Sequence, residues 1–175
     1  MKKTLSFLTL IFALAQLQAQ NINQVVIDPN IDREILIGEI NESGLQNTIF
    51  VDTWQNQLDN YSPDKHTVKK LKKIIRKNKN LSVKVFFASW CGDSKEHLPN
   101  FVKLVHQIKL DQVSYYALNR QMIMDEYDFI DVFSFNVERV PTFIIYQNDT
   151  EIGRIIETPT VSLEKDLLKI LKGKK

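Results

Sequence analysis

Cysteine is nearly absent from this chain of 175 residues, which carries one, Cys91. A single cysteine cannot close an internal disulfide, and it cannot supply the paired cysteines of a C-x-x-C-H haem motif or of most zinc sites. Glycine is also scarce, with five residues, and none of them forms a glycine-rich phosphate-binding loop. The sequence therefore predicts no metal and no cofactor, and its chemistry centres on one thiol.

The first 19 residues differ in character from the rest of the chain. Lys2 and Lys3 form a basic start, the segment from Leu5 to Leu17 is mostly apolar, and Ala19 is a small residue of the kind that a signal peptidase requires. This pattern predicts a secretory signal peptide over residues 1–19, with Ala15 as the second choice of cleavage site. A retained N-terminal anchor is the alternative, although the apolar part is short for a membrane span.

Processing of this kind would place the chain outside the cytoplasm, either in the periplasm or in the medium, with no membrane span left. An unpaired thiol in such a compartment is either reactive or joined to another molecule. Loss of Lys2 and Lys3 reduces the basic residues from 23 to 21, against 21 acidic residues. The processed chain is formally neutral, so its net charge favours neither nucleic acid nor an anionic membrane.

A helix with a strongly basic surface is predicted to begin at Pro63, with Ser62 as its N-cap. Its apolar residues, among them Val68 and Leu71, recur at helical spacing and form one buried stripe. Such a helix can bind an anionic surface, but a run of charge is more often a solvated face. No aromatic residues are interleaved with the basic ones, which argues against nucleic acid. The basic residues are Lys69, Lys70, Lys72, Lys73, Arg76, Lys77 and Lys79.

The stretch around Cys91 combines a strand with a helix. The apolar run from Val83 to Ala88 predicts a buried strand. Beyond Gly92 the apolar residues fall at helical spacing, as Leu98, Phe101 and Val105 illustrate. The thiol therefore lies at or near a helix N-terminus, where unpaired backbone N–H groups and the helix dipole stabilise a thiolate. These properties make Cys91 the candidate nucleophile.

Two motifs in this order resemble the thioredoxin superfamily. Trp90-Cys91-Gly92, followed by a helix with Pro99 in its first turns, is similar to the W-C-G-P-C active site, although this chain has W-C-G-D-S. Val140-Pro141-Thr142 is similar to the cis-proline loop that faces the active-site cysteine in that family. The resemblance implies an α/β fold, with a central mixed sheet that carries helices on both faces. It also implies a groove at Val140, Pro141 and Thr142 that receives an extended substrate strand.

The resemblance covers residues 63–175, and residues 20–62 form an N-terminal extension to it. We expect Gln20 to Arg33 to be a tail or leading loop, Glu34 to Ile40 a short strand, and Asn41 to Gly44 a turn. From Thr48 onward, apolar residues at three- and four-residue steps predict an amphipathic helix. The extension is thus expected to be mainly helical. Within the main domain, a further helix is predicted over Asp125 to Phe133.

Departures from the family motif bear on the chemistry. Ser94 occupies the position of the resolving cysteine, and a serine hydroxyl is not ionised near neutral pH, so two-cysteine cycling within this site is excluded. Asp93 opposes formation of a thiolate at Cys91, whereas Lys95, one helical turn away, favours it. Ser94 could donate a hydrogen bond to the thiolate. The buried acid that many thioredoxins carry six residues before the first cysteine is replaced by Val85.

Three classes of function are compatible with these features. The first is a monothiol protein that exchanges thiols and disulfides through Cys91, of which a thiol peroxidase would be a minor variant. Trp90, Gly92, Asp93, Ser94 and Lys95 would support the thiol, and a small thiol or a partner protein would release the product. The second is a thioredoxin scaffold that traps or holds client proteins through a cysteine or without chemistry. The third is an interaction protein that dimerises through a Cys91–Cys91 disulfide.

Overall fold

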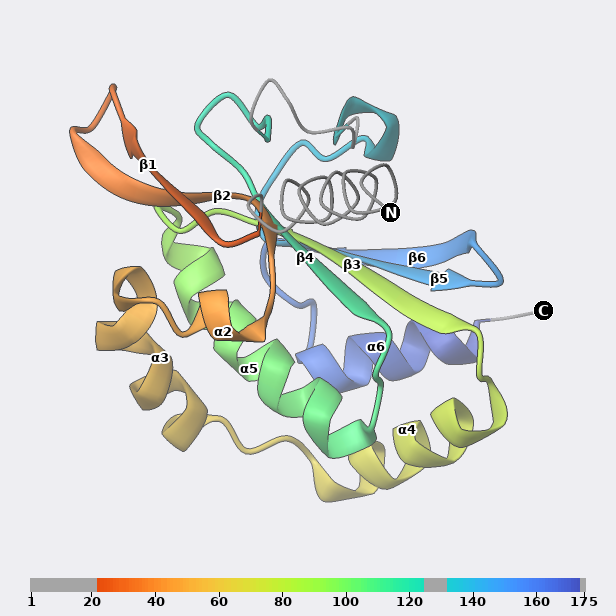
Figure 1. Cartoon of the computed structure of the whole chain (residues 1–175). Helices are drawn as coiled ribbons and strands as arrows, with labels where there is room; N and C mark the ends of the chain where they lie inside the picture. The colour runs from red at the N-terminus through yellow and green to blue at the C-terminus, as the bar shows by residue number, and fades with distance from the viewer. Residues whose placement is uncertain (1–21, 125–131, 174–175) are drawn as a thin grey trace, which may run out of the picture.

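The computed structural model describes residues 22–124 and 132–173 (Figure 1). The predicted signal peptide, and residues 125–131 of the predicted helix over Asp125 to Phe133, lie outside the described residues. The remainder of that prediction falls on a short 3₁₀ helix. The elements in chain order are β1 (Gln24–Asp28), β2 (Arg33–Ile40), α2 (Glu42–Leu45), α3 (Thr48–Asn60), α4 (Lys65–Lys77), β3 (Leu81–Phe87), α5 (Gly92–Ile108), β4 (Val113–Ala117), η2 (Val132–Phe135), β5 (Thr142–Gln147), β6 (Thr150–Ile156) and α6 (Leu163–Lys172).

The strands form one mixed sheet in the order β1-β2-β4-β3-β5-β6. Only β3 and β4 pair in parallel, and the other neighbours are antiparallel. The apolar run of β3 lies inside the sheet, between β4 and β5, and Val85, Phe86 and Phe87 have no exposed surface. A strand that is covered on both faces must be apolar throughout. The predicted position of this strand in the middle of the sheet is confirmed.

Helical elements cover both faces of the sheet, as the resemblance implied. One face carries α3, α4, α5 and α6, which bury Trp54, Leu71, Phe101 and Leu167 in the larger core cluster with alternate residues of β3. The opposite face carries a smaller cluster around Phe86, to which the 3₁₀ helix η2 contributes Val132. The thiol end of the molecule is therefore supported by two separate cores.

The extension contains more strand than the sequence pattern indicated. The prediction of a tail over Gln20 to Arg33 is wrong within the described residues, because β1 pairs with β2 along its whole length. Asp28 closes this hairpin: its carboxylate accepts a hydrogen bond from the Asn30 backbone N–H at 2.8 Å, and its carbonyl accepts one from Asp32 at 2.9 Å. Aspartate commonly stabilises a turn in this way. The strand expected over Glu34 to Ile40 is confirmed as β2.

Two further local predictions in this part of the chain need correction. The segment from Asn41 to Gly44 was expected to be a turn, but α2 begins at Glu42, and the Asn41 side chain caps it by accepting from Gly44 N. The amphipathic helix from Thr48 is confirmed as α3. The N-cap of α4 is Asp64 and not Ser62, because the Asp64 carboxylate accepts hydrogen bonds from both Thr67 N and Thr67 Oγ1. These bonds lower the pKa of Asp64.

The described ranges, 22–124 and 132–173, contain no helix with the length and apolar character needed to cross a bilayer.

Candidate active site

Cys91 lies at the junction of β3 and α5. Its backbone has extended dihedral angles and forms the N-cap of α5, but its side chain makes no capping hydrogen bond. The half-buried Sγ donates instead to the Val140 carbonyl oxygen at 3.3 Å. The first-turn N–H groups of a helix have no partners within the helix, so this end of α5 favours negative charge. The predicted position of the thiol at a helix N-terminus is confirmed.

The loop before β5 brings the second motif against the thiol. The Val140–Pro141 peptide bond is cis. The Pro141 carbonyl accepts a hydrogen bond from Glu157 N at 2.7 Å, and the Thr142 hydroxyl donates to the Arg139 carbonyl at 2.6 Å. Thr142 itself begins β5, where it is paired with Phe86 and with Ile156. The loop is therefore held on both sides of the peptide group that faces Cys91.

Ser94 has a structural role in this arrangement. Its side chain is fully buried, and its Oγ accepts a hydrogen bond from Ala88 N at 3.2 Å. This bond joins the first turn of α5 to the residue that follows β3. The sequence suggested that Ser94 donates a hydrogen bond to the thiolate. In the structure its oxygen accepts a hydrogen bond from the Ala88 backbone N–H.

The other residues of the motif are more exposed. Gly92 is exposed, and a Cβ atom added there would meet nothing within 4 Å, so steric crowding does not require glycine at this position. Asp93 and Lys95 are half-exposed. Neither forms an ion pair within the described part of the chain. Their effect on the thiol is thus a through-space effect of two solvated charges.

Trp90 is held by partners that the sequence did not reveal. Its indole Nε1 donates to the Leu118 carbonyl at 3.0 Å, and the guanidinium of Arg120 lies 5.0 Å from its ring centroid. The Arg120 Nε is in turn 3.7 Å from a carboxylate oxygen of Asp28, which is only 3% exposed. This arrangement connects the end of β1 to the residue beside the thiol. No sequence motif pointed to it, because Asp28 and Trp90 are brought together only by the sheet.

The thiol lies in largely apolar surroundings. Cys91 and Trp90 pack against the smaller core cluster, which includes Val140 and Leu118. Val85, at the position of the missing acid, is fully buried in the larger cluster on the opposite face. Two histidines lie on α5: His97 is buried, and His106 is exposed and hydrogen-bonded to Glu42 at 2.8 Å. The described residues contain no group of three or more His, Cys, Asp or Glu that could hold a metal ion.

This chain is similar to known proteins chiefly over its second part. The family model described as Thioredoxin matches residues 62–169, which is more than half of the chain. A thioredoxin-like protein of Acanthamoeba polyphaga mimivirus is 29% identical over 91 residues, which is 52% of this chain and 63% of the viral protein. The match thus spans less than two thirds of that relative.

Solved structures with a similar chain path include a thioredoxin from Fasciola hepatica. It is 24% identical, with a TM-score of 0.39, and the match covers 60% of this chain and 91% of that one. A Pseudomonas aeruginosa protein of unknown function is 14% identical, with a TM-score of 0.47, and the match covers 73% and 84%.

Proposed function

Because this chain belongs to the thioredoxin family, a family of thiol–disulfide redox proteins, we propose that it is a monothiol exchange protein that acts through Cys91. The observation that carries the proposal is the contact between Cys91 Sγ and the Val140 carbonyl at 3.3 Å. This contact lies beside the loop at Pro141, and Cys91 also forms the N-cap of α5. Ser94 stands where a second cysteine would be, so the site contains one reactive group.

The proposed exchange has two steps, and each conserves atoms and electrons. The Cys91 thiolate attacks one sulfur of a substrate disulfide, the S–S bond breaks, and the second sulfur leaves as a thiolate that takes up a proton. The product is a mixed disulfide between Cys91 and the client. A thiolate from a small thiol or a partner protein then attacks the client sulfur, forms a new disulfide with it, and restores the Cys91 thiolate.

The groove beside the thiol would position the client. Val140 and Thr142 flank Pro141, and an extended substrate segment could pair with backbone groups of this loop. The Cys91 thiol now donates to the Val140 carbonyl, and this hydrogen bond is lost when the thiol releases its proton to solvent and becomes the attacking thiolate. In this proposal Trp90, Gly92, Asp93 and Lys95 surround the thiol, while Ser94 maintains the helix start through Ala88.

A scaffold that holds clients is the second candidate, and the burial of Ser94 favours it. The serine side chain is inaccessible and already bonded, so nothing within this site releases a mixed disulfide. The captured client would remain bound until an external thiol arrived. An interaction protein that dimerises through a Cys91–Cys91 disulfide is the third candidate. All three roles are consistent with a compartment outside the cytoplasm, which we propose from residues 1–19. None of them involves nucleic acid.

The test uses the processed full chain and a peptide that carries a mixed disulfide with glutathione. Stopped-flow or chromatographic assays would measure release of the peptide thiol in the presence of reduced glutathione. We expect catalysis by the wild type, complete loss in Cys91→Ala, and retention in Ser94→Ala within about twofold, because Ser94 takes no part in exchange. Ser94→Ala is the control, because it removes the hydrogen bond to Ala88 N but leaves the Cys91 thiol in place.

Two outcomes would decide against exchange. If wild type is no faster than glutathione alone but accumulates a stable mixed disulfide at Cys91, the protein is a trap. If Cys91→Ala retains the wild-type rate, the thiol is not the nucleophile. Reaction of the wild-type thiol with iodoacetamide, measured on folded protein, would show that the lack of activity is not due to an inaccessible sulfur.

A further inference from the structure

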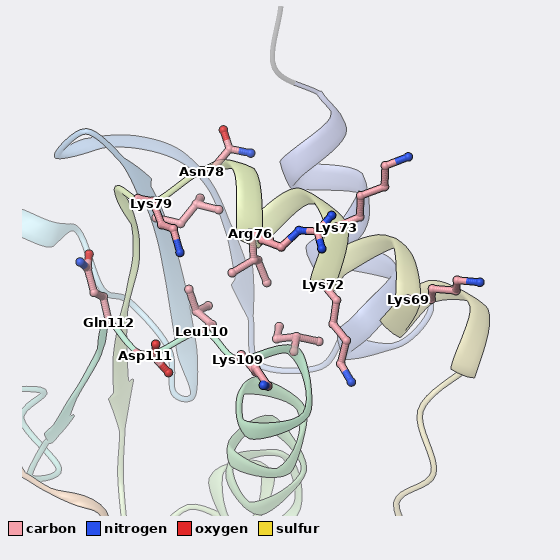
Figure 2. A pocket seen from close by; sticks show the side chains of 13 residues that line it. Lys69, Lys72, Lys73, Arg76, Asn78, Lys79, Lys109, Leu110, Asp111 and Gln112 are labelled. Carbon is pink, nitrogen blue, oxygen red and sulfur yellow. The ribbon is translucent and has the colours of Figure 1, made fainter.

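A cavity of about 950 Å³ lies at the end of the molecule opposite the thiol. It is bounded by α4 from Lys69 onward, by the turn into β3, and by the end of α5 with the residues that follow it (Figure 2). Because β3 and α5 both run from one end of the molecule to the other, the 17 residues of α5, at about 1.5 Å each, separate this cavity from Cys91 by about 25 Å. The cavity is therefore a separate feature from the proposed active site.

Six cationic side chains surround this cavity, which we call the basic groove. They come from three separate segments, and all of them are exposed: Lys69, Lys72, Lys73 and Arg76 from α4, Lys79 from the turn, and Lys109 from the end of α5. In Figure 2, Lys72, Arg76, Lys79 and Lys109 lie around a common region, and the side chains of Lys69 and Lys73 extend outward from α4. None of the six forms an ion pair within the described part of the chain. Their charge is therefore not neutralised by the protein.

The negative charge around the groove is too small to offset these cations. Among the residues that the structure describes, Asp111 is the one acidic side chain that lines the cavity. The C-terminal ends of α4 and α5 also border it, and each contributes about half of an elementary negative charge. Together these groups amount to about two negative charges against six positive ones. The groove therefore retains about four positive charges, and like-charged pairs such as Lys72 and Arg76, four residues apart, destabilise α4 when nothing neutralises them.

The floor of the groove is apolar. Leu81 and Ile108 are 3% and 1% exposed and belong to the larger core cluster, and Leu110 borders them. The cavity volume lies in the range of small-molecule sites, which commonly combine an apolar lining with a few polar groups that fix orientation. A concave surface with charge at its rim is suited to a compact ligand more than to a flat bilayer.

We propose that the basic groove binds a compact small molecule that carries at least three anionic groups, of the phosphate or sulfate type, on an organic body. Three separate segments contribute cations, and only a compact ligand can contact all of them at once. The organic body would rest on the apolar floor beside Leu81 and Leu110. Of the described side chains that line the cavity, none is aromatic, so they offer no stacking platform for a nucleobase.

Calorimetric titration of the processed full chain with inorganic tripolyphosphate would test the anionic part of this proposal. Tripolyphosphate carries several charges in a small volume and has no organic body. We expect saturable binding with one site per chain. The double substitution Lys72→Gln/Arg76→Gln should weaken binding by about tenfold, because each removes an unneutralised charge within reach of a multivalent anion. Binding should also weaken as the salt concentration rises.

A matched variant on α6 controls for net charge. Lys165 and Lys169 are exposed, four residues apart on one helix, and absent from the groove lining, as Lys72 and Arg76 are four apart within it. Lys165→Gln/Lys169→Gln should leave the affinity for tripolyphosphate within about twofold of wild type, since the two charges that it removes lie outside the basic groove. Cys91→Ala should also bind normally, which separates this proposal from the proposed exchange function.

Three results would overturn the proposal. The first is the absence of saturable binding by wild type. The second is an equal loss of affinity in the α6 variant, which would show that only net charge matters. The third is tight binding to vesicles of phosphatidylglycerol that depends on Lys72 and Arg76, with no binding of tripolyphosphate, which would identify this end as a membrane contact.

Discussion

The two ends of the β3–α5 unit are built in opposite ways. At the thiol end, Cys91, Ser94 and Trp90 each make a specific hydrogen bond, to Val140, Ala88 and Leu118 respectively. At the other end, the cations of the basic groove are long, exposed and without ion-pair partners among the described residues. The first end presents one geometry, which covalent chemistry requires. The second presents adaptable charge, which suits reversible binding of an anion.

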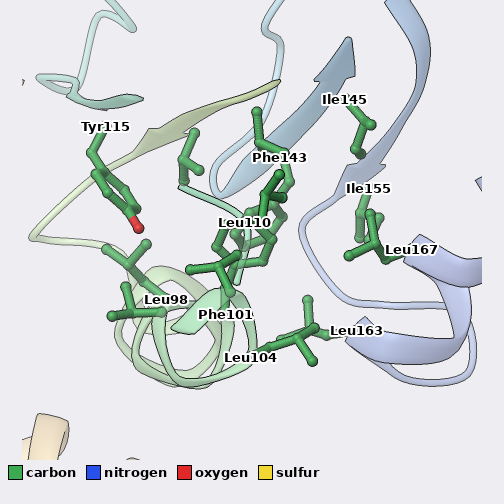
Figure 3. Packing of buried hydrophobic residues seen from close by; sticks show 14 of the residues in the cluster. Leu98, Phe101, Leu104, Leu110, Tyr115, Phe143, Ile145, Ile155, Leu163 and Leu167 are labelled. Atoms are coloured by element: carbon green, nitrogen blue, oxygen red, sulfur yellow. The ribbon is translucent and has the colours of Figure 1, made fainter. Parts of the chain in front are cut away.

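One core connects the two ends. Leu98, Phe101 and Leu104 of α5 pack toward the sheet and α6 (Figure 3). The Phe101 ring lies 4.5 Å from the Phe143 ring, centroid to centroid, and both side chains are almost fully buried. The same helix thus begins at the thiol and ends at the groove, and its packing positions both.

Phe101→Ala should have the largest effect, because it removes the foundation that both ends share. Truncation of a buried phenylalanine costs about 3–5 kcal/mol in the free energy of unfolding. Chemical denaturation would measure the loss. We expect both the exchange activity and tripolyphosphate binding to fall with the folded fraction. If the variant is destabilised as expected but keeps either the exchange activity or tripolyphosphate binding, the two ends are supported independently.

Arg120→Ala should affect the thiol end and spare the basic end. It leaves the buried Asp28 carboxylate without its cationic neighbour, and we expect a loss of about 2 kcal/mol, less than for a fully buried pair because Arg120 is 42% exposed. Asp28→Asn should recover part of this loss in the double variant, which a double-mutant cycle would measure. Additive effects of the two substitutions would contradict a coupling between Asp28 and Arg120.

Two tyrosines, the partly buried Tyr61 and the buried Tyr115, offer a comparison that depends on pH. The Tyr61 hydroxyl donates to Glu164 at 3.0 Å, whereas the buried Tyr115 hydroxyl has no hydrogen-bond partner among the described groups. Burial, together with Glu164 for Tyr61 and Glu42 for Tyr115, raises the pKa of each phenol above its usual value near 10. At pH 7 we expect Tyr61→Phe to cost about 1 kcal/mol and Tyr115→Phe to cost almost nothing.

The sign of the pH dependence follows from the raised pKa values. A phenol whose pKa is higher in the folded state contributes stability that is fully present below pH 10 and is lost as the pH rises above 10. Denaturation at pH 7 and pH 10.5, in a Cys91→Ser background, should show a smaller decline for each Phe variant than for its parent. Equal declines in all three proteins would mean that these phenols ionise without unfolding.

Asp93→Asn should have the smallest effect and should be confined to the thiol end. It removes a negative charge near Cys91, and at this exposure a solvated charge contributes well under 1 kcal/mol. We expect alkylation of the thiol by iodoacetamide at pH 7 to become about two- to threefold faster. Asp111→Asn, at the basic end, is the matched control and should leave the rate unchanged. A similar acceleration in both variants would indicate a general charge effect.

Much of the fold could be predicted from local patterns. The apolar run of β3, the helical spacing of α5 and the motif around Pro141 each predicted an element that the structure contains. The N-terminal region was harder to predict, because β1 is short and its sequence shows neither a continuous apolar run nor a clear alternation of apolar and polar residues. Its Val25 and Ile27 are exposed. A strand at the edge of a sheet depends on its neighbour for stability, and one sequence does not identify that neighbour.

Sequence alone determined that this protein has one thiol, that the thiol lies between a strand and a helix, and that Ser94 cannot resolve a mixed disulfide. These properties depend on residue identity and on short spacings. Only the tertiary structure decided that the Val140 carbonyl accepts the hydrogen bond of the Cys91 thiol, that Asp28 reaches Arg120, and that a charged helix borders a cavity. Such contacts depend on the order of strands and on how helices pack, which residues near one another in sequence do not specify.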